Sequence, residues 1–209
     1  MSQAQAAPGQ VAMPARAEPA EVVAASAVRA DPGPLGLAAF ALTTFVLSFA
    51  NAGIIGGSSV EIVLALALAY GGLAQLLAGM WEFRNGNTFG ATAFSSFGAF
   101  WLSYAAFVFW FAPALKPADA PGAVGTYLLA WGIFTAYMWI ATLKHAWPVM
   151  IVFLLLTVTF FLLAIGEYST NETFKHLGGY VGILTAIAAW YASASNIINE
   201  AFKRPLLPR

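Results

Sequence analysis

Residues 70–101 contain two long apolar segments joined by a short polar hinge, and they constrain the fold more than any other part of the chain. Uncharged polar side chains lie inside both segments, interleaved with glycines. Hydrocarbon offers no hydrogen-bond partner, so such side chains in a membrane-length helix need another helix or a water-filled cavity. The glycines let neighbouring backbones approach closely. This pattern predicts packed helices within a bilayer, and it favours conduction of a small polar solute over simple anchoring.

The composition identifies the class of protein. The chain is 60% hydrophobic and only 9% charged, whereas soluble domains are about 45–50% apolar and about 25% charged. It is therefore expected to be an integral membrane protein of the all-α class. It contains no cysteine, which excludes disulfides and thiolate chemistry.

The sequence contains no pattern typical of an enzyme. It has no histidine-rich metal spacing, no nucleophile with a histidine partner and no phosphate-binding glycine loop. We therefore expect no catalytic site, no metal and no cofactor. His145 and His176 lie beside lysines near the ends of apolar segments and are expected to be solvated loop residues. The net charge of zero gives no reason to expect a nucleic-acid partner.

Six segments approach the length of about 20 apolar residues that a transmembrane helix needs. They predict six transmembrane helices at about 35–57, 60–81, 89–112, 123–143, 148–166 and 178–198. We expect one transmembrane domain over 35–200 and a short tail over 201–209. Residues 1–34 are rich in alanine and proline and lack the apolar core of a secretory signal, so we expect a flexible tail there.

The distribution of lysine and arginine predicts the orientation. One side of the predicted bundle carries Arg16, Arg29, Arg84, Lys144, Lys203, Arg204 and Arg209, and the other carries Lys116 and Lys175. Cytoplasmic loops carry the excess of these residues. We therefore expect a multi-pass protein of the inner (plasma) membrane with both termini in the cytoplasm.

Polar residues within the predicted spans are the candidate substrate contacts. Thr44 and Asn51 are seven residues apart and share one helix face, which either lines a pore or packs against another helix. Gln75 lies deep in the second span, where its amide must find partners. The full set of candidate polar contacts is Thr43, Thr44, Asn51, Gln75, Thr92 and Ser96. No charged residue lies at the centre of a span, which favours a weakly polar path with apolar narrowings and excludes a ring of fixed charges.

Several motifs then resemble one family. Asp31–Phe40, followed by Thr43 and Thr44, resembles the signature N-P-A-P-L-G-L-x-x-F-x-x-T-T of the acetate uptake transporter family. That family includes the acetate and succinate–proton symporters of bacteria. Further matches follow in order at Tyr70–Gln75, Gly86–Gly90, Thr92–Phe94, Leu129–Thr135, Thr142–Lys144 and Asn199–Phe202. Asp31 and Gly33 depart from the signature, where the family has asparagine and alanine.

The resemblance implies a homo-hexamer with a separate pore in each protomer. It also implies an apolar constriction, which the motifs place at Phe40, Phe97 and Leu156. Phe97 departs from the family, which usually has a tyrosine at this position. The implied function is transport of acetate and related short carboxylates, with succinate as a further candidate, either coupled to protons or as an anion channel. The residues themselves leave a second class open, a channel for a small neutral solute such as ammonia, water or glycerol.

Overall fold

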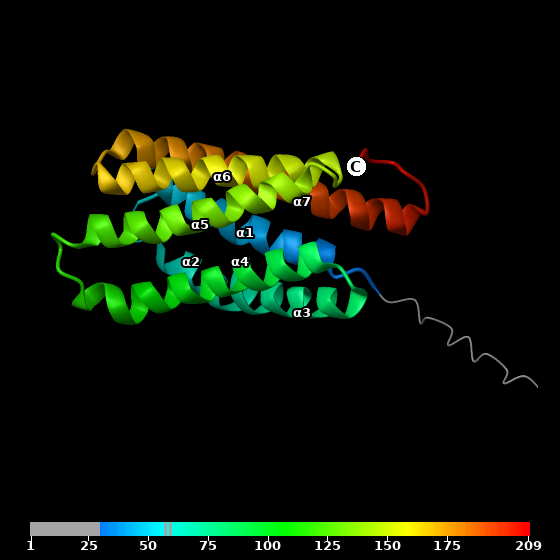
Figure 1. The fold of residues 1–209 in the computed structure, drawn as a ribbon, viewed down its shortest axis with the longest axis horizontal. Coiled ribbons are helices and arrows are strands. Elements are labelled where there is room, and N and C mark those ends of the chain that lie inside the picture. Colours follow the sequence, from blue (N-terminus) through cyan, green and yellow to red (C-terminus); the bar gives the residue numbers. More distant parts are fainter. Residues whose placement is uncertain (1–29, 57, 59) are drawn as a thin grey trace, which may run out of the picture.

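Six helical stretches, each long and apolar enough to cross a membrane, form the bundle in the described part of the computed structural model (Figure 1). The structure describes residues 30–56, 58 and 60–209. The helices are α1 (Gly33–Asn51), α2 (Val60–Leu68), α3 (Gln75–Asn85), α4 (Thr88–Ala106), α5 (Ala120–Thr142), α6 (Trp147–Tyr168) and α7 (Glu172–Phe202). A π-helical segment η2 (Ala69–Ala74) joins α2 to α3, and η3 (Phe107–Phe111) and η4 (Ala112–Ala114) extend α4. The predicted all-α class with six membrane-spanning helices is confirmed.

The ends of the helices follow from local chemistry. The α1 helix ends at Asn51, short of the predicted residue 57, because Gly53 adopts a left-handed conformation with φ of 71°. The α7 helix begins earlier than predicted because the side chain of Asn171 accepts a hydrogen bond from the Thr173 N–H at 2.9 Å. The α1 helix starts at Gly33, which falls within the predicted N-terminal tail. Residues 1–29 of that tail lie outside the described residues.

The polar hinge between the two apolar segments forms a tight turn between α3 and α4. Gly86 has a φ of 73°, and the Asn87 side chain accepts a hydrogen bond from the Gly90 N–H at 3.0 Å. A Cβ atom added to Gly98 would lie 2.7 Å from the backbone nitrogen of Leu76. This contact shows that a glycine of the α4 segment serves the close packing of α3 against α4.

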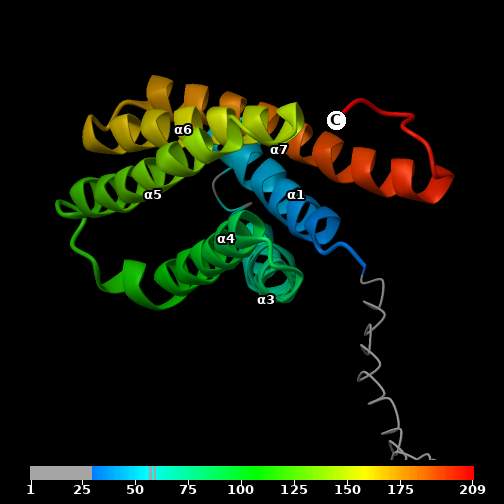
Figure 2. The same cartoon turned by 45° about the vertical axis from the view of Figure 1, so that its right-hand side comes forward.

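The helices pack as two groups, with α1 between them (Figure 2). The closest backbone packing is between α1 and α7, α6 and α7, α5 and α6, and α3 and α4. Within the described part of the chain, the backbone of α4 does not pack closely against α5 or α6. Large side chains fill the space between these helices, and the candidate site lies there.

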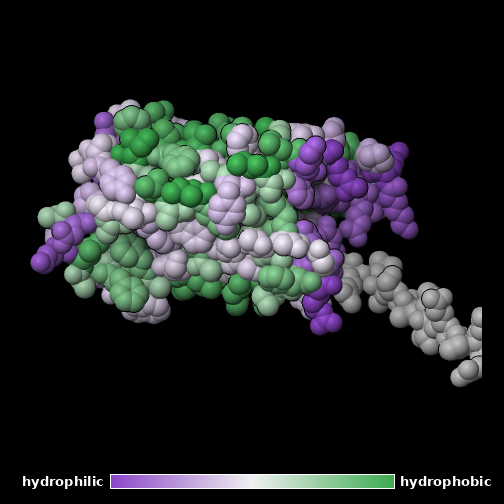
Figure 3. Space-filling view, viewed as in Figure 1, coloured by the Kyte–Doolittle hydropathy of each residue, from purple (hydrophilic) through white to green (hydrophobic). Residues whose placement is uncertain are grey.

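The two ends of the bundle differ in charge. At the terminal end, where α1 begins and α7 ends, the described cations are Arg84, Lys144, Lys203, Arg204 and Arg209. At the opposite end, here called the far end, they are Lys116 and Lys175. Apolar side chains cover much of the flank, and hydrophilic ones gather at the terminal end (Figure 3). The flank is thus suited to contact lipid. The unequal distribution of lysine and arginine along the sequence places most of the described cations at one end of the folded bundle.

Candidate functional site

A cavity of about 840 Å³ enters the bundle at the far end. Its wall is formed by α1, α4, α5 and α6, together with the first turn of α7. The residues at the mouth include Glu167, Glu172, Lys175 and His176. Of the lining residues on α1, Phe40 lies furthest from the far end, so it marks the floor.

The floor of the cavity is apolar and tightly packed. Phe40, Phe97 and Leu156 are 5%, 3% and 4% exposed, and they belong to one buried hydrophobic cluster. Phe40 and Leu156 line the cavity, whereas Phe97 lies behind Phe40 with the two ring centroids 5.7 Å apart. The structure therefore brings together the three residues that the family resemblance assigns to the constriction.

Aromatic rings continue from this floor toward the terminal end. The Phe97 ring contacts Phe153 at a centroid distance of 6.0 Å, and Phe153 contacts Phe89 at 5.2 Å. Phe89 in turn lies 4.5 Å from the ring of His145, in the turn between α5 and α6. Further rings from α5 pack against Phe97 from the side. The space between the two groups of helices is thus open at the far end and filled by rings toward the terminal end.

Two polar side chains on the cavity wall have unused hydrogen-bonding capacity. Thr44 Oγ1 and Trp101 Nε1 are buried and have no hydrogen-bond partner among the described residues. Thr44 and Trp101 are 6% and 2% exposed, and both line the cavity. A buried donor without a partner costs about 1–3 kcal/mol. Both groups lie just behind the cavity surface, so a small rotation of the side chain would be needed to bring either donor to an occupant.

Other polar side chains on the wall are already bonded within the protein. The Thr159 hydroxyl donates to the Leu155 carbonyl at 2.9 Å. The hydroxyls of Tyr127 and Ser103 share a hydrogen bond of 2.7 Å. These groups shape the cavity, whereas Asn51, which also lines it and is half-buried, makes no side-chain hydrogen bond among the described residues.

The predicted polar residues divide into two groups. Thr44 and Asn51 both line the cavity. Of the two alternatives for their shared helix face, lining a pore or packing against another helix, the first agrees with this position. Thr43, Gln75, Thr92 and Ser96 do not line it. The Thr43 hydroxyl donates to the Ala39 carbonyl at 2.9 Å and lies against Gly71 of η2, and Gln75 is only 1% exposed. As substrate contacts, all six residues remain predictions.

The sequence analysis missed several residues of the cavity. Trp101 lies one turn beyond Phe97 on α4, and this spacing is the signal that could have identified it. His176 was expected to be a solvated loop residue, but it lies at the cavity mouth on the first turns of α7. Its position follows from the longer α7, whose start the apolar pattern alone did not locate.

Comparison with known proteins agrees with this architecture. The model of the GPR1/FUN34/yaaH family matches residues 15–205. The chain belongs to this family. It is the acetate transporter family that the sequence motifs resembled, so that prediction is confirmed.

Named members of the family are similar over most of this chain. The succinate-acetate/proton symporter SatP of Escherichia coli K12 is 43% identical over 181 residues, which cover 86% of this chain and 94% of SatP. The ammonia transport outward protein 2 of Saccharomyces cerevisiae is 44% identical over 176 residues, which cover 82% of this chain and 62% of the yeast protein.

A solved structure of the family has the same fold. The structure of the bacterial acetate channel SatP matches with a TM-score of 0.81 and 41% sequence identity, over 86% of this chain and 98% of the solved chain. The names of these relatives describe transporters and a channel, and none describes an enzyme.

Proposed function

We propose that this protein transports acetate and related short carboxylates across a membrane, through a pore within each protomer. The observation that carries the proposal is the cavity itself, whose wall carries the polar residues Thr44 and Asn51 above an apolar floor at Phe40 and Leu156. A short carboxylic acid has matching parts, since its carboxyl group accepts hydrogen bonds and its carbon chain is apolar.

The floor favours the neutral acid over the anion. Carboxylic acids titrate near pH 4–5, so acetate is almost entirely ionised at neutral pH. An apolar narrowing penalises a bare charge heavily, and the few polar groups on the cavity wall replace only part of the lost hydration. No acidic or basic residue of the described chain lines the cavity between its mouth and its floor. The proton that crosses with the anion is therefore proposed to be carried by the substrate.

The assembly and orientation are part of the same proposal. The family resemblance supports a homo-hexamer in the inner (plasma) membrane. The excess of lysine and arginine at the terminal end supports cytoplasmic termini, and the cavity then opens toward the outside. A mass measurement in mild detergent, on protein that still transports acetate, tests the hexamer. A purely monomeric, active sample would overturn it.

Flux of labelled acetate into proteoliposomes tests the function. Uptake is expected to exceed that of empty liposomes, to rise as the external pH falls, and to be reduced by unlabelled short carboxylates. One relative is named for outward transport of ammonia, so ammonia flux is measured in the same vesicles. Accelerated ammonia flux with no acetate uptake would overturn the proposal in favour of a neutral-solute channel.

A further inference from the structure

Three charged side chains meet at the cavity mouth. Lys175 Nζ lies 3.3 Å from Glu167 Oε1 and 3.2 Å from Glu172 Oε1. Glu167 lies at the end of α6, and the other two lie in the first turns of α7. All three line the cavity. This mouth triad combines two carboxylates with one ammonium group, so it carries one net negative charge.

The fold holds the triad in place. A Cβ atom added to Gly166 would lie 2.9 Å from the Lys175 backbone nitrogen and 2.7 Å from Lys175 Cγ. Glycine at this position therefore lets the start of α7 press against the end of α6. The side chains of Lys175 and Glu167 are 25% and 26% exposed, whereas that of Glu172 is 68% exposed. Lys175 is shared between two carboxylates, which makes it a poor receptor for a further anion.

We propose that the mouth triad makes this protein select monocarboxylates over dicarboxylates, an inference that rests on the proposed transport function. A negative mouth repels an incoming solute in proportion to the solute's charge, so a dianion is repelled twice as strongly as a monoanion. A neutral acid is not repelled at all. The triad thus acts before the substrate reaches the constriction.

The interior of the cavity acts in the same direction. Phe40 and Leu156 close the path at the apolar floor, so the leading carboxyl group of a substrate advances no further than this point. A second carboxylate on the same molecule has to extend back toward the mouth. There the second carboxylate meets Glu167 and Glu172. These two side chains already bind the Lys175 ammonium group, which could otherwise neutralise the second carboxylate.

Competition experiments in proteoliposomes test the inference. Uptake of labelled acetate at pH 7 is measured with unlabelled succinate or unlabelled propionate as competitor. The result is expressed as the ratio of the two half-inhibitory concentrations, which cancels effects common to all anions. Glu172→Gln makes the mouth neutral, and Glu167→Gln combined with Glu172→Gln makes it positive. Lys175→Gln makes it more negative.

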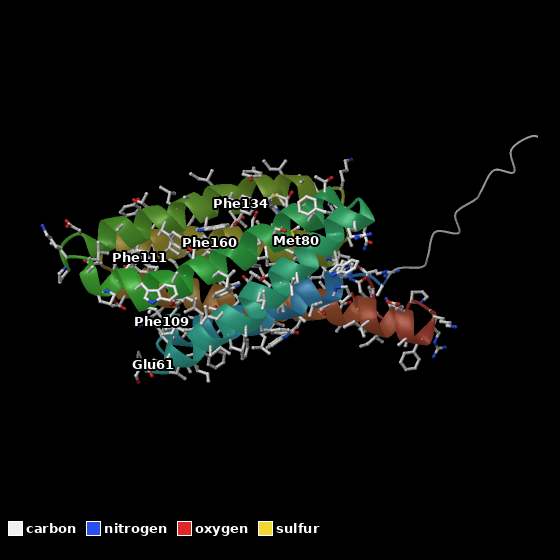
Figure 4. The ribbon with its side chains drawn as sticks, turned by 90° about the horizontal axis from the view of Figure 1, so that it is seen from below. Glu61, Met80, Phe109, Phe111, Phe134 and Phe160 are labelled. Carbon is white, nitrogen blue, oxygen red and sulfur yellow. The ribbon has the colours of Figure 1, made fainter. Side chains whose placement is uncertain are left out.

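Glu172→Gln and the double variant should each lower the ratio of half-inhibitory concentrations, succinate over propionate, by about two- to fivefold. Lys175→Gln should raise this ratio. The effects should shrink at high salt, because mobile ions screen charges at an exposed mouth. Glu61→Gln is the matched control. Glu61 lies at the same end of the bundle, as do Phe109 and Phe111 (Figure 4), but it does not line the cavity. Its substitution should leave the ratio unchanged.

The outcomes separate this inference from the proposed function. Persistent acetate uptake with the same ratio in all variants would overturn the selectivity role of the triad and leave transport intact. Absence of acetate uptake by the unmodified protein would overturn the function itself. Glu172 is largely exposed, so its substitution should be tolerated even if the half-buried Glu167 proves necessary for folding. An equal shift in Glu61→Gln would assign the effect to general surface charge and also overturn the inference.

Discussion

Phe40 and Phe97 pack ring against ring with their centroids 5.7 Å apart, and only Phe40 reaches the cavity. The contact joins α1 to α4 at the place where open space gives way to packed rings. A solute that moves past this point has to displace aromatic side chains, because the space beyond contains Phe153 and Phe89 in sequence. We therefore place the main barrier to permeation at Phe40 and Phe97 and not at the cavity mouth.

Phe97→Tyr should change the pH dependence of acetate uptake. The added hydroxyl would place a donor next to the floor, where one hydrogen bond to a charged group contributes about 1.5–3 kcal/mol. The anion gains more from that donor than the neutral acid, so uptake should fall less steeply as the pH rises. Labelled-acetate uptake measured across external pH checks this.

The control for this change is Phe45→Tyr. Phe45 packs against Phe49 and Trp190 on another face of α1 and does not line the cavity. The control should keep the original pH profile. Identical profiles for Phe97→Tyr and the unmodified protein would place the barrier elsewhere on the path.

Leu156→Ala should widen the floor and admit bulkier acids. Leu156 is 4% exposed and faces the cavity, so truncation removes apolar volume at the narrowing without adding polarity. The ratio of butyrate to acetate uptake should rise. Some loss of thermal stability is also expected, because a cavity in a packed core is destabilising.

Leu155→Ala separates these two effects. Leu155 is the neighbouring leucine of α6, is half-buried and does not line the cavity. Its truncation should lower stability without changing the uptake ratio. A similar rise in the ratio for both variants would mean that general loosening of α6, and not the floor, sets the size limit.

Thr44→Val and Trp101→Phe should reduce acetate transport. Each change removes a buried donor that has no protein partner and keeps most of the side-chain shape. Loss of one such hydrogen bond to a substrate should weaken apparent affinity about five- to thirtyfold, which corresponds to about 1–2 kcal/mol. Thr44→Val should maintain stability or increase it, because the unpaired hydroxyl carried a desolvation cost, whereas Trp101→Phe should lower it, because the smaller ring leaves a cavity in the core.

Concentration dependence of acetate uptake and thermal unfolding of the same samples check this prediction. Thr126→Val is the control, since the exposed Thr126 hydroxyl donates to the Gly122 carbonyl of α5 and shares a hydrogen bond with the Tyr168 hydroxyl of α6. It should leave uptake unchanged. Unchanged affinity in both Thr44→Val and Trp101→Phe would show that these donors do not contact the substrate.

The sequence predicted the architecture because the relevant signals are local. Length and apolar content determine a membrane span, and the Asn87 cap and the Gly86 turn are encoded in adjacent residues. Thr44 and Asn51 could be placed on one face because helix periodicity is regular, and both line the cavity.

The rest of the site depends on contacts between distant segments. The cavity exists because rings from α4, α5 and α6 hold apart helices whose backbones do not pack closely, and no local pattern predicts that distance. Trp101 is only 2% exposed, and its burial depends on how α4 packs against other segments. The mouth triad required knowledge that Gly166 brings Glu167 and Lys175 together.

Single cysteines should test the orientation cleanly, because the natural chain contains none. Ala118 lies in the link between α4 and α5 at the far end, and Ala146 lies in the turn between α5 and α6 at the terminal end, and both are exposed. Because lysine and arginine are in excess at the terminal end, Ala118→Cys should react with a membrane-impermeant maleimide in intact cells. Ala146→Cys should react only after the membrane is opened. The reverse pattern would invert the protein and turn the cavity toward the cytoplasm, and equal labelling of both sites in intact cells would contradict a fixed orientation. Acetate uptake by both variants serves as the check that each is correctly folded.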